Sequence, residues 1–246
     1  KIGIDAAPLT LPFNCGVKRY ATELLFGIAM IDHKNDYYIF ASGKIMIPKQ
    51  KNFHHVKIPK FPILKRQVFL PYLANKERLD VFHYLEPYGS VLFKHANIVT
   101  TVHDIDLKPT YPIFSKNILR RIYCEVTRRF VFKNSKIFIV PTKDISDELN
   151  DFLHSESGKR PVNVTYLGIS REFRKERSKN KYQSYFLTMG DFAPRKNVFR
   201  VISAYAELPK DIRSIFKLIV IASTSKSAEK FTHMAAKIGV KERVVV

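Results

Sequence analysis

The sequence predicts an α/β protein in which doubly wound parallel sheets form two successive units. Short apolar segments alternate with helical patterns along most of the chain, the order expected when helices connect parallel strands. Some of these segments, such as 136–140, are apolar on both faces, as strands inside a parallel sheet are. A stretch of mostly charged residues, 171–181, interrupts the series once. It predicts a linker between two packed units.

The first unit begins with a strand at 1–5, followed by a loop and an amphipathic helix. The apolar residues of this helix recur three and four positions apart, which predicts one buried face: they are Val17, Tyr20, Ala21, Leu24, Leu25 and Ile28. Further strands are expected at 37–41, 79–84, 97–102 and 136–140. Ser115 and Thr142 are candidate caps of two more helices, because their hydroxyl oxygens can accept from free backbone N–H groups.

The second unit repeats the pattern with fewer elements. Strands are expected at 185–189, 216–222 and 244–246, and helices at 198–208 and 226–238. Three strands with two or three helices form a core that is small for an independently stable unit. We therefore expect the second unit to be incomplete and the chain to be a fragment of a longer protein.

Composition limits the class of protein. The 246 residues contain 42 Lys and Arg against 22 Asp and Glu, a formal charge of +20, which favours anionic partners such as nucleotides, nucleic acid or lipid. A hydrophobic content of 46% excludes a disordered chain. The two cysteines, Cys15 and Cys124, have no C-x-x-C spacing, which argues against a disulfide framework and a structural zinc site. No apolar run approaches the ~18 residues of a spanning helix, so we expect a soluble or peripheral protein.

The segment PRKN at 194–197 is the strongest candidate site in the second unit. It follows an apolar strand that ends at Gly190 and opens a helix, so Arg195 and Lys196 should lie beside the free N–H groups of a helix start. Cations there oppose the helix dipole by roughly 0.3 to 1 kcal/mol each unless an anion offsets the cost. The segment therefore predicts a diphosphate site, although cations near a helix start can also be simply solvated.

His103 and Gly16 are the candidate site residues of the first unit. His103 follows the apolar strand 98–102, which places it at the edge where open α/β sheets bind ligands. Gly16 precedes a helix start, and its missing side chain would let an anion approach the backbone. Each residue also has a structural interpretation: His103 can pair with Asp104, and Gly16 can be a turn residue.

Five motifs in succession give the chain a resemblance to a known family. They are CGVKRYATELL around Gly16, TVHDID followed by Tyr111 and Pro112, IFIVPTKDISDEL, the YLGI turn at 166–169 and FLTMGDFAPRKN. In this order they resemble the retaining GT-B glycosyltransferases of family 4, and the resemblance covers essentially the whole chain.

The resemblance implies two Rossmann-like domains that face a cleft. Residues 1–175 would form the N-terminal, acceptor-side domain, and 176–246 the incomplete start of the donor-binding domain. His103 would lie by the reacting centre, and Gly16 would let its loop approach the donor diphosphate. Arg195 and Lys196 would neutralise that diphosphate as it leaves, so neither a cofactor nor a metal is expected.

The partners implied are a nucleotide-sugar and a glycan or lipid-linked acceptor, with no specific nucleic acid. The setting implied is bacterial cell-surface polysaccharide synthesis in the cytoplasm. The basic and apolar segment 57–78 and the charge of +20 predict peripheral attachment to an anionic surface, the inner face of the membrane. The sequence differs from the family pattern in two ways. Asp191 stands where many relatives have Arg, and the acidic donor motif of the family would lie beyond Val246. We therefore expect this chain alone to bind donor poorly and not to turn over.

Three alternatives remain open from the sequence. Asp104 and Asp106 match the D-x-D pattern that metal-dependent, single-domain GT-A transferases use to hold a cation against the donor. The segment 57–78 mixes basic and apolar residues, as a non-catalytic module that binds membranes or nucleic acid would. An epimerase of the GT-B architecture, acting on the sugar nucleotide itself, is the third.

Overall fold

The computed structural model describes residues 1–12, 15–60, 64–93, 97–104, 118–156, 158–170, 184–191 and 196–246. The chain divides into two compact units, Lys1–Phe173 and Arg174–Val246. Each unit has a sheet and a buried apolar core of its own. The predicted linker 171–181 and the candidate cap Ser115 lie outside the described residues.

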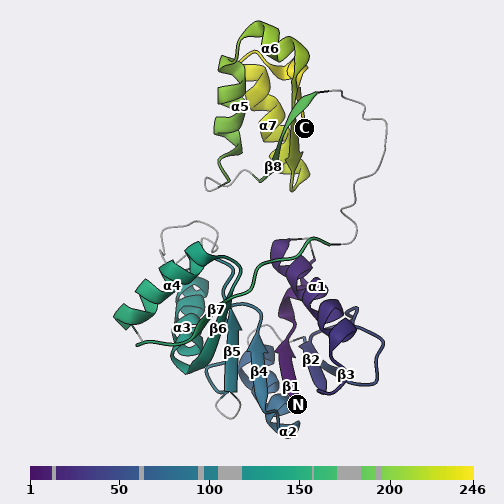
Figure 1. Ribbon diagram of the computed structural model, residues 1–246, viewed down its shortest axis with the longest axis vertical. Coiled ribbons are helices and arrows are strands. Elements are labelled where there is room, and N and C mark those ends of the chain that lie inside the picture. The colour runs from purple at the N-terminus through teal and green to yellow at the C-terminus, as the bar shows by residue number, and fades with distance from the viewer. Residues whose placement is uncertain are drawn as a thin grey trace. The chain divides into compact units, whose positions relative to one another are not determined.

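The first unit is built on a seven-stranded parallel sheet in the order β3-β2-β1-β4-β5-β6-β7. The chain runs outward from β1 to β3 and then returns to place β4 on the other side of β1 (Figure 1). Such a reversal of strand order marks where doubly wound sheets bind ligands, at the carboxyl ends of the strands. The strands are β1 Ile2–Asp5, β2 Tyr37–Ala41, β3 Phe53–Lys57, β4 Val81–Tyr84, β5 Asn97–Thr101, β6 Ser135–Val140 and β7 Val162–Val164.

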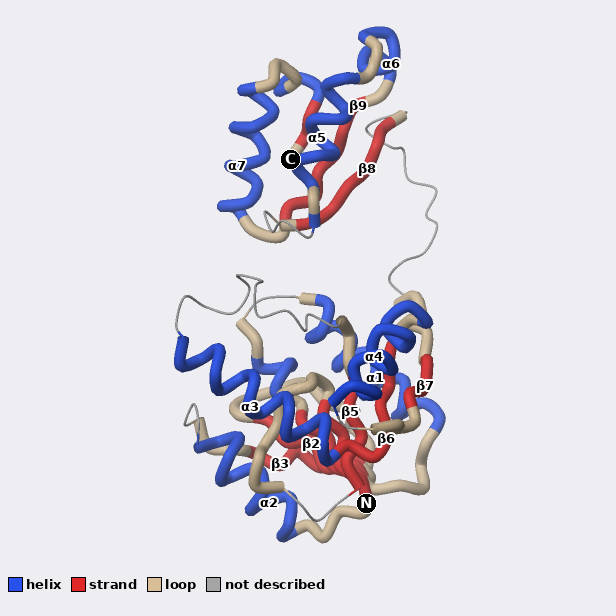
Figure 2. The backbone as a smooth tube through the Cα atoms, turned by 90° about the vertical axis from the view of Figure 1, so that its left-hand side faces the viewer, coloured by secondary structure: helices blue, strands red, loops and turns tan. Residues whose placement is uncertain are grey.

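Helices cover both faces of this sheet. Ile39 packs in the same buried cluster as α1, whereas its neighbour Phe40 packs in the cluster that contains Leu70 of α2. Successive residues of a strand point to opposite faces, so α1 and α2 lie on opposite sides of the strands (Figure 2). The helices are α1 Gly16–Ile31, α2 Leu70–Lys76 after a π-helical turn at Lys65–Phe69, α3 Ile118–Asn134 and α4 Lys143–Glu156, and a 3₁₀ turn spans Ala7–Thr10.

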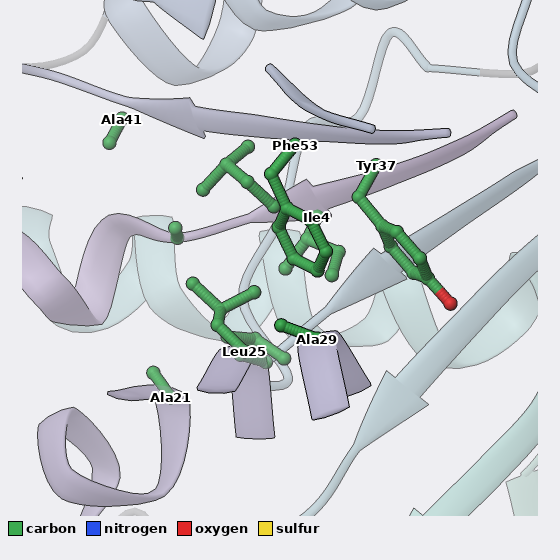
Figure 3. Packing of buried hydrophobic residues seen from close by; sticks show 10 residues of the cluster. Ile4, Ala21, Leu25, Ala29, Tyr37, Ala41 and Phe53 are labelled. Carbon is green, nitrogen blue, oxygen red and sulfur yellow. The ribbon is translucent and has the colours of Figure 1, made fainter. Parts of the chain in front are cut away.

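The predicted apolar face of α1 fixes this helix to the sheet. Ala21, Leu25 and Ala29 are buried on α1 and pack with Ile4 of β1 and Phe53 of β3 (Figure 3). Ile4 is 1% exposed and Leu25 is fully buried, and each such side chain contributes roughly 1.5 to 3 kcal/mol on burial. The packing holds the first turn of α1 at the carboxyl edge of the sheet.

The second unit has a three-stranded parallel sheet in the order β10-β9-β8. Val198, Ile202 and Tyr205 of α5 form its core together with Leu218 of β9 and Phe231 of α7. The predicted elements occur at the expected positions, and α6 is additional. The bounds are β8 Tyr185–Gly190, α5 Val198–Glu207, α6 Lys210–Ile215, β9 Lys217–Ala222, α7 Ser225–Lys237 and β10 Val244–Val245.

Most sequence-based boundaries of the first unit are confirmed to within two residues, and Thr142 caps α4 by accepting a hydrogen bond from the Ile145 N–H at 3.3 Å. The strands β3 and β7 were not predicted. In β3 the adjacent polar residues His54 and His55 interrupt the alternation that indicates a strand, and β7 has only three residues. Within the described residues, no helix is long and apolar enough to cross a membrane.

Candidate functional site

His103 lies at the carboxyl edge of the first sheet, two residues after β5 ends at Thr101. Its side chain is half-buried, and its Nε2 lies 3.0 Å from the carbonyl oxygen of Leu85. A carbonyl oxygen only accepts, so Nε2 carries the hydrogen in this contact. The neutral imidazole then presents Nδ1 as a hydrogen-bond acceptor.

The surroundings of His103 favour this neutral form. Burial lowers the pKa of His103, against a smaller opposing effect of the Leu85 hydrogen bond and the Asp104 carboxylate. Burial, together with the charge of His103, also lowers the pKa of His83 on β4 to about 4. Both imidazoles are therefore uncharged at neutral pH, and the His103 ring can accept a hydrogen bond from a hydroxyl at Nδ1.

The start of α1 lies beside His103. Tyr20, one turn after Gly16, meets the His103 ring edge-on with 4.6 Å between ring centroids. The Tyr20 hydroxyl is 3.3 Å from Thr101 Oγ1, which also lies 2.8 Å from Nε2 of His83. The fold thus brings the helix that Gly16 opens and the imidazole of His103 to one edge of the sheet.

Gly16 itself is exposed as the first residue of α1, and no side-chain hydrogen bond from Cys15 caps the helix. A Cβ atom built on Gly16 would meet no atom of the described residues within 4 Å. Packing among these residues therefore does not require glycine here. A requirement for glycine would come from a ligand that approaches the backbone.

A cavity of about 400 Å³ opens at the same edge of the first sheet, and we call it the Arg66 cavity. Arg66 donates to Asp5 Oδ2 from Nη2 at 2.8 Å and from Nε at 3.1 Å, while Asp5 Oδ1 accepts from the Ala7 N–H at 3.1 Å. The cavity lining consists of Asp5, Ala7, Pro8, Thr10, Leu11, Phe40, Ala41, Ser42, Ile58, Arg66, Leu70, Glu86, Tyr88, Tyr123 and Cys124.

Charge in the Arg66 cavity is nearly balanced. Burial opposes the charge of Arg66, but Asp5 and Glu86 raise the pKa of its guanidinium above the ordinary value. Burial raises the pKa of Glu86, which the charge of Arg66 partly offsets. Gln67 donates to the Tyr123 hydroxyl at 2.9 Å and so orients a further polar group of the lining. Such convergent donors and acceptors suit a neutral ligand rich in hydroxyl groups.

The Arg66 cavity was not predicted from the sequence, where Arg66 counted only as one cation of the segment 57–78. Its partner Asp5 is 61 residues away in the chain, and no local pattern reports such a contact. One signal was available: Asp5 ends β1 and Glu86 follows β4 by two residues. Acids at the carboxyl ends of two adjacent central strands could have indicated the site.

In the second unit, Lys196 is exposed just before α5 begins. A Cβ atom on Gly190 would lie 2.9 Å from Val198 Cγ2 and 3.2 Å from Lys196 Cβ, so glycine allows the segment before α5 to fold against the end of β8. Asn197, with φ of 51°, takes a left-handed conformation in this turn. Arg195 lies outside the described residues, and the structure does not relate Lys196 to His103.

The metal-binding alternative rests on residues that are only partly described. Asp104 is exposed, and Asp106 lies outside the described residues. Among the residues that the structure describes, no three His, Cys, Asp or Glu side chains form a group that could hold a metal ion.

Solved structures resemble the chain over nearly its whole length. WaaG, a glycosyltransferase involved in lipopolysaccharide biosynthesis, matches with a TM-score of 0.66 and 18% identity, over 99% of this chain and 69% of WaaG. Anabaena Alr3699/HepE in complex with UDP matches with a TM-score of 0.62 and 13% identity, over 99% and 67%. A trehalose-6-phosphate synthase studied for glycosyl transfer with retention matches with a TM-score of 0.55 and 13% identity, over 99% and 71%.

These likenesses show that the chain has the GT-B fold, with Rossmann-like parallel sheets in two units. The single-domain GT-A alternative is therefore wrong, because its fold would leave the second unit without a place. No protein-family model matches the sequence, and no curated protein sequence matches it.

Proposed function

We propose that this chain belongs to a retaining glycosyltransferase of family 4, which moves a sugar from a nucleotide-sugar to a hydroxyl of a glycan or lipid-linked acceptor. The observation that carries the proposal is the neutral His103 imidazole beside the start of α1, at the ligand-binding edge of a GT-B fold. The UDP bound to Alr3699/HepE supports a nucleotide-sugar as the donor. The study of glycosyl transfer with retention in trehalose-6-phosphate synthase supports a retaining reaction.

The proposed mechanism assigns each predicted residue a physical task. His103 accepts a hydrogen bond at Nδ1 from a hydroxyl of the reacting sugars and orients it, and Gly16 lets the first turn of α1 approach the donor diphosphate. When the glycosyl-phosphate bond breaks, negative charge develops on the leaving oxygen. Arg195 and Lys196 stabilise this charge, since fixed cations are most effective where charge appears in the transition state.

The two units divide the substrates in this proposal. Residues 1–175 would bind the acceptor, for which the Arg66 cavity offers hydroxyl-matching groups. Residues 176–246 would contribute the first part of the donor site, and further residues of a longer protein would complete it. A role in bacterial cell-surface polysaccharide synthesis is supported by the likeness to WaaG.

A peripheral place on the inner face of the bacterial membrane is part of the proposal. Leu64, Val68 and Tyr72 are 51%, 45% and 66% exposed and recur every four residues, so they share one face of the helical segment before and within α2. With the basic residues of 57–78, this face suits an anionic lipid surface. Co-sedimentation at low salt should be stronger with anionic than with neutral vesicles, and equal binding would contradict the attachment.

Transfer in the full-length protein that contains this chain is the direct test. His103→Ala and Lys196→Ala should each lower the rate of transfer by roughly 10²-fold or more, as expected when one group that stabilises or orients the transition state is lost. His54→Ala and Lys210→Ala are matched controls: His54 belongs to β3 and Lys210 opens α6. The assay follows sugar transfer and nucleotide release with a panel of nucleotide-sugars.

Near-normal rates in both site variants, with unchanged thermal unfolding, would contradict the assigned roles. His103→Gln separates chemistry from folding, because its amide nitrogen replaces Nε2 and can still donate to the Leu85 carbonyl, whereas the Nδ1 acceptor is lost. Product analysis without acceptor distinguishes the transferase from the epimerase alternative, which would convert the sugar nucleotide under those conditions.

A further inference from the structure

A second cavity, of about 560 Å³, opens at the carboxyl edge of the first sheet, and we call it the basic cavity. Its three cations come from three different places: Lys18 from the first turn of α1, Lys44 from the segment after β2 and Lys60 from the segment after β3. None of the described lining residues is acidic. The lining consists of Leu9, Thr10, Leu11, Lys18, Ser42, Gly43, Lys44 and Lys60.

One of these lysines is held by a backbone contact, and the side chain of another lies close to a turn. The half-buried Lys18 donates from Nζ to the Leu11 carbonyl oxygen at 2.7 Å, which leaves two of its three N–H groups for another acceptor. Gly43 has a φ of +97°, and the Cε of Lys60 lies 3.6 Å from where a Cβ of Gly43 would be. The Lys60 stem therefore lies along the turn that presents Lys44.

The basic cavity adjoins the Arg66 cavity, because Thr10, Leu11 and Ser42 line both. The two differ in charge: in the Arg66 cavity two acids, Asp5 and Glu86, flank one cation, whereas the charged residues that line the described part of the basic cavity are all cations. A molecule that occupies both would place hydroxyl groups in the first and an anionic group in the second.

We propose that the basic cavity binds the phosphate group of a phosphorylated acceptor sugar whose ring occupies the Arg66 cavity. Three lysines line one space with no described acid among them, and a phosphate there can offset their like charges and accept charge-assisted hydrogen bonds. The acceptor role rests on the proposed glycosyl transfer. The phosphate site itself rests on the lysine geometry alone.

Calorimetric titration of the intact chain at low salt tests the site without any donor. Glucose 6-phosphate should bind more tightly than glucose, and Lys44→Ala/Lys60→Ala should weaken its binding roughly tenfold or more, since two charge-assisted contacts are lost. Lys49→Ala/Lys51→Ala is the matched control. Both residues are exposed, lie in the connection between β2 and β3 that also holds Lys44, and do not belong to the cavity lining. It removes the same charge and should leave the affinity within about twofold.

Equal weakening in the two double variants would overturn the proposal, because it would assign the affinity to the general charge of +20. So would glucose binding as tightly as glucose 6-phosphate. Vesicles of phosphatidylglycerol form a separate arm: if Lys44 and Lys60 matter for vesicle binding but not for glucose 6-phosphate, the phosphate belongs to a lipid headgroup and the acceptor assignment fails. Loss of transfer in His103→Ala is measured separately, so failure of the phosphate site and failure of the transferase proposal are distinguishable.

Discussion

The strands β1 and β8 each lead one of the two units, yet their surroundings differ. β1 pairs with β2 on one side and with β4 on the other, and its Ile4 is 1% exposed. Among the residues that the structure describes, β8 pairs only with β9, which lies beside it in Figure 2. Its Leu187 and Met189 are 57% and 69% exposed. Both strands are apolar in sequence. The difference shows that pattern decides where a strand forms, whereas its neighbours decide how much of it is buried.

The same difference shapes the two candidate sites. At the carboxyl end of β1, the adjoining strand β4 and the segment that holds Arg66 enclose Asp5, which is 2% exposed. At the carboxyl end of β8, Gly190 and Lys196 form an open turn in which Lys196 remains exposed. Burial perturbs the pKa values of His83, Glu86 and His103 around the first site. The first site is thus organised by desolvation and buried ion pairing, and the second by backbone geometry.

The largest expected effect comes from a matched pair of substitutions at the third residue of each leading strand. Ile4→Ala should lower the free energy of unfolding of the first unit by about 2 to 5 kcal/mol, because it leaves a cavity in a close-packed cluster. Leu187→Ala should cost less than about 1 kcal/mol, since its side chain is mostly in solvent. Hydrogen exchange of peptides from each unit, measured along a denaturant series on the intact chain, reports the two effects separately.

Ile4→Val is the graded control, with an expected cost of roughly 0.5 to 1.5 kcal/mol. A loss at Leu187 as large as that at Ile4 would break the comparison, because it would mean that the exposed side of β8 is covered in solution.

The sequence predicted the regular elements better than their contacts. Five strands of the first sheet and the buried face of α1 could be predicted because they depend on local periodicity. In α3 the apolar residues that mark the helix are largely exposed, with Ile118 59% and Ile122 54% exposed, while Val131 and Phe132 near its end are buried. Periodicity locates an amphipathic helix, but which apolar residues meet the sheet depends on how the helix docks.

The residues of the candidate site also differ in whether a local pattern or a distant contact determines their role. His103 and Gly16 could be singled out because strand ends and helix starts are readable locally. Arg66 could not, because its role depends on the contact with Asp5 across 61 residues. The placement of Arg195 remains a prediction. The functions proposed for all four predicted site residues also remain predictions, which the transfer assay tests.

An effect expected to be smaller than that of Ile4→Ala is a pH dependence that belongs to the buried polar groups of the first unit. Burial lowers the pKa of His83 from the ordinary 6.5 to about 4. Between these values the unfolded chain binds a proton at His83 that the folded chain does not, so the free energy of unfolding should fall as pH falls from about 6.5 to 4, by on the order of 2 kcal/mol. His103 acts in the same direction, and the raised pKa of Glu86 acts in the opposite one.

The contribution of His83 is therefore obtained by comparing the pH profile of a His83 variant with that of wild type. His83→Gln should flatten the pH profile of the first unit relative to wild type, and its amide can still form a hydrogen bond with Thr101. His233→Gln, at an exposed position of α7 in the second unit, is the control and should leave the profile as in wild type. If the His83→Gln profile runs parallel to that of wild type between pH 4 and 6.5, the imidazole is solvated in the folded chain, and the contrast between an enclosed first site and an open second one loses its electrostatic basis.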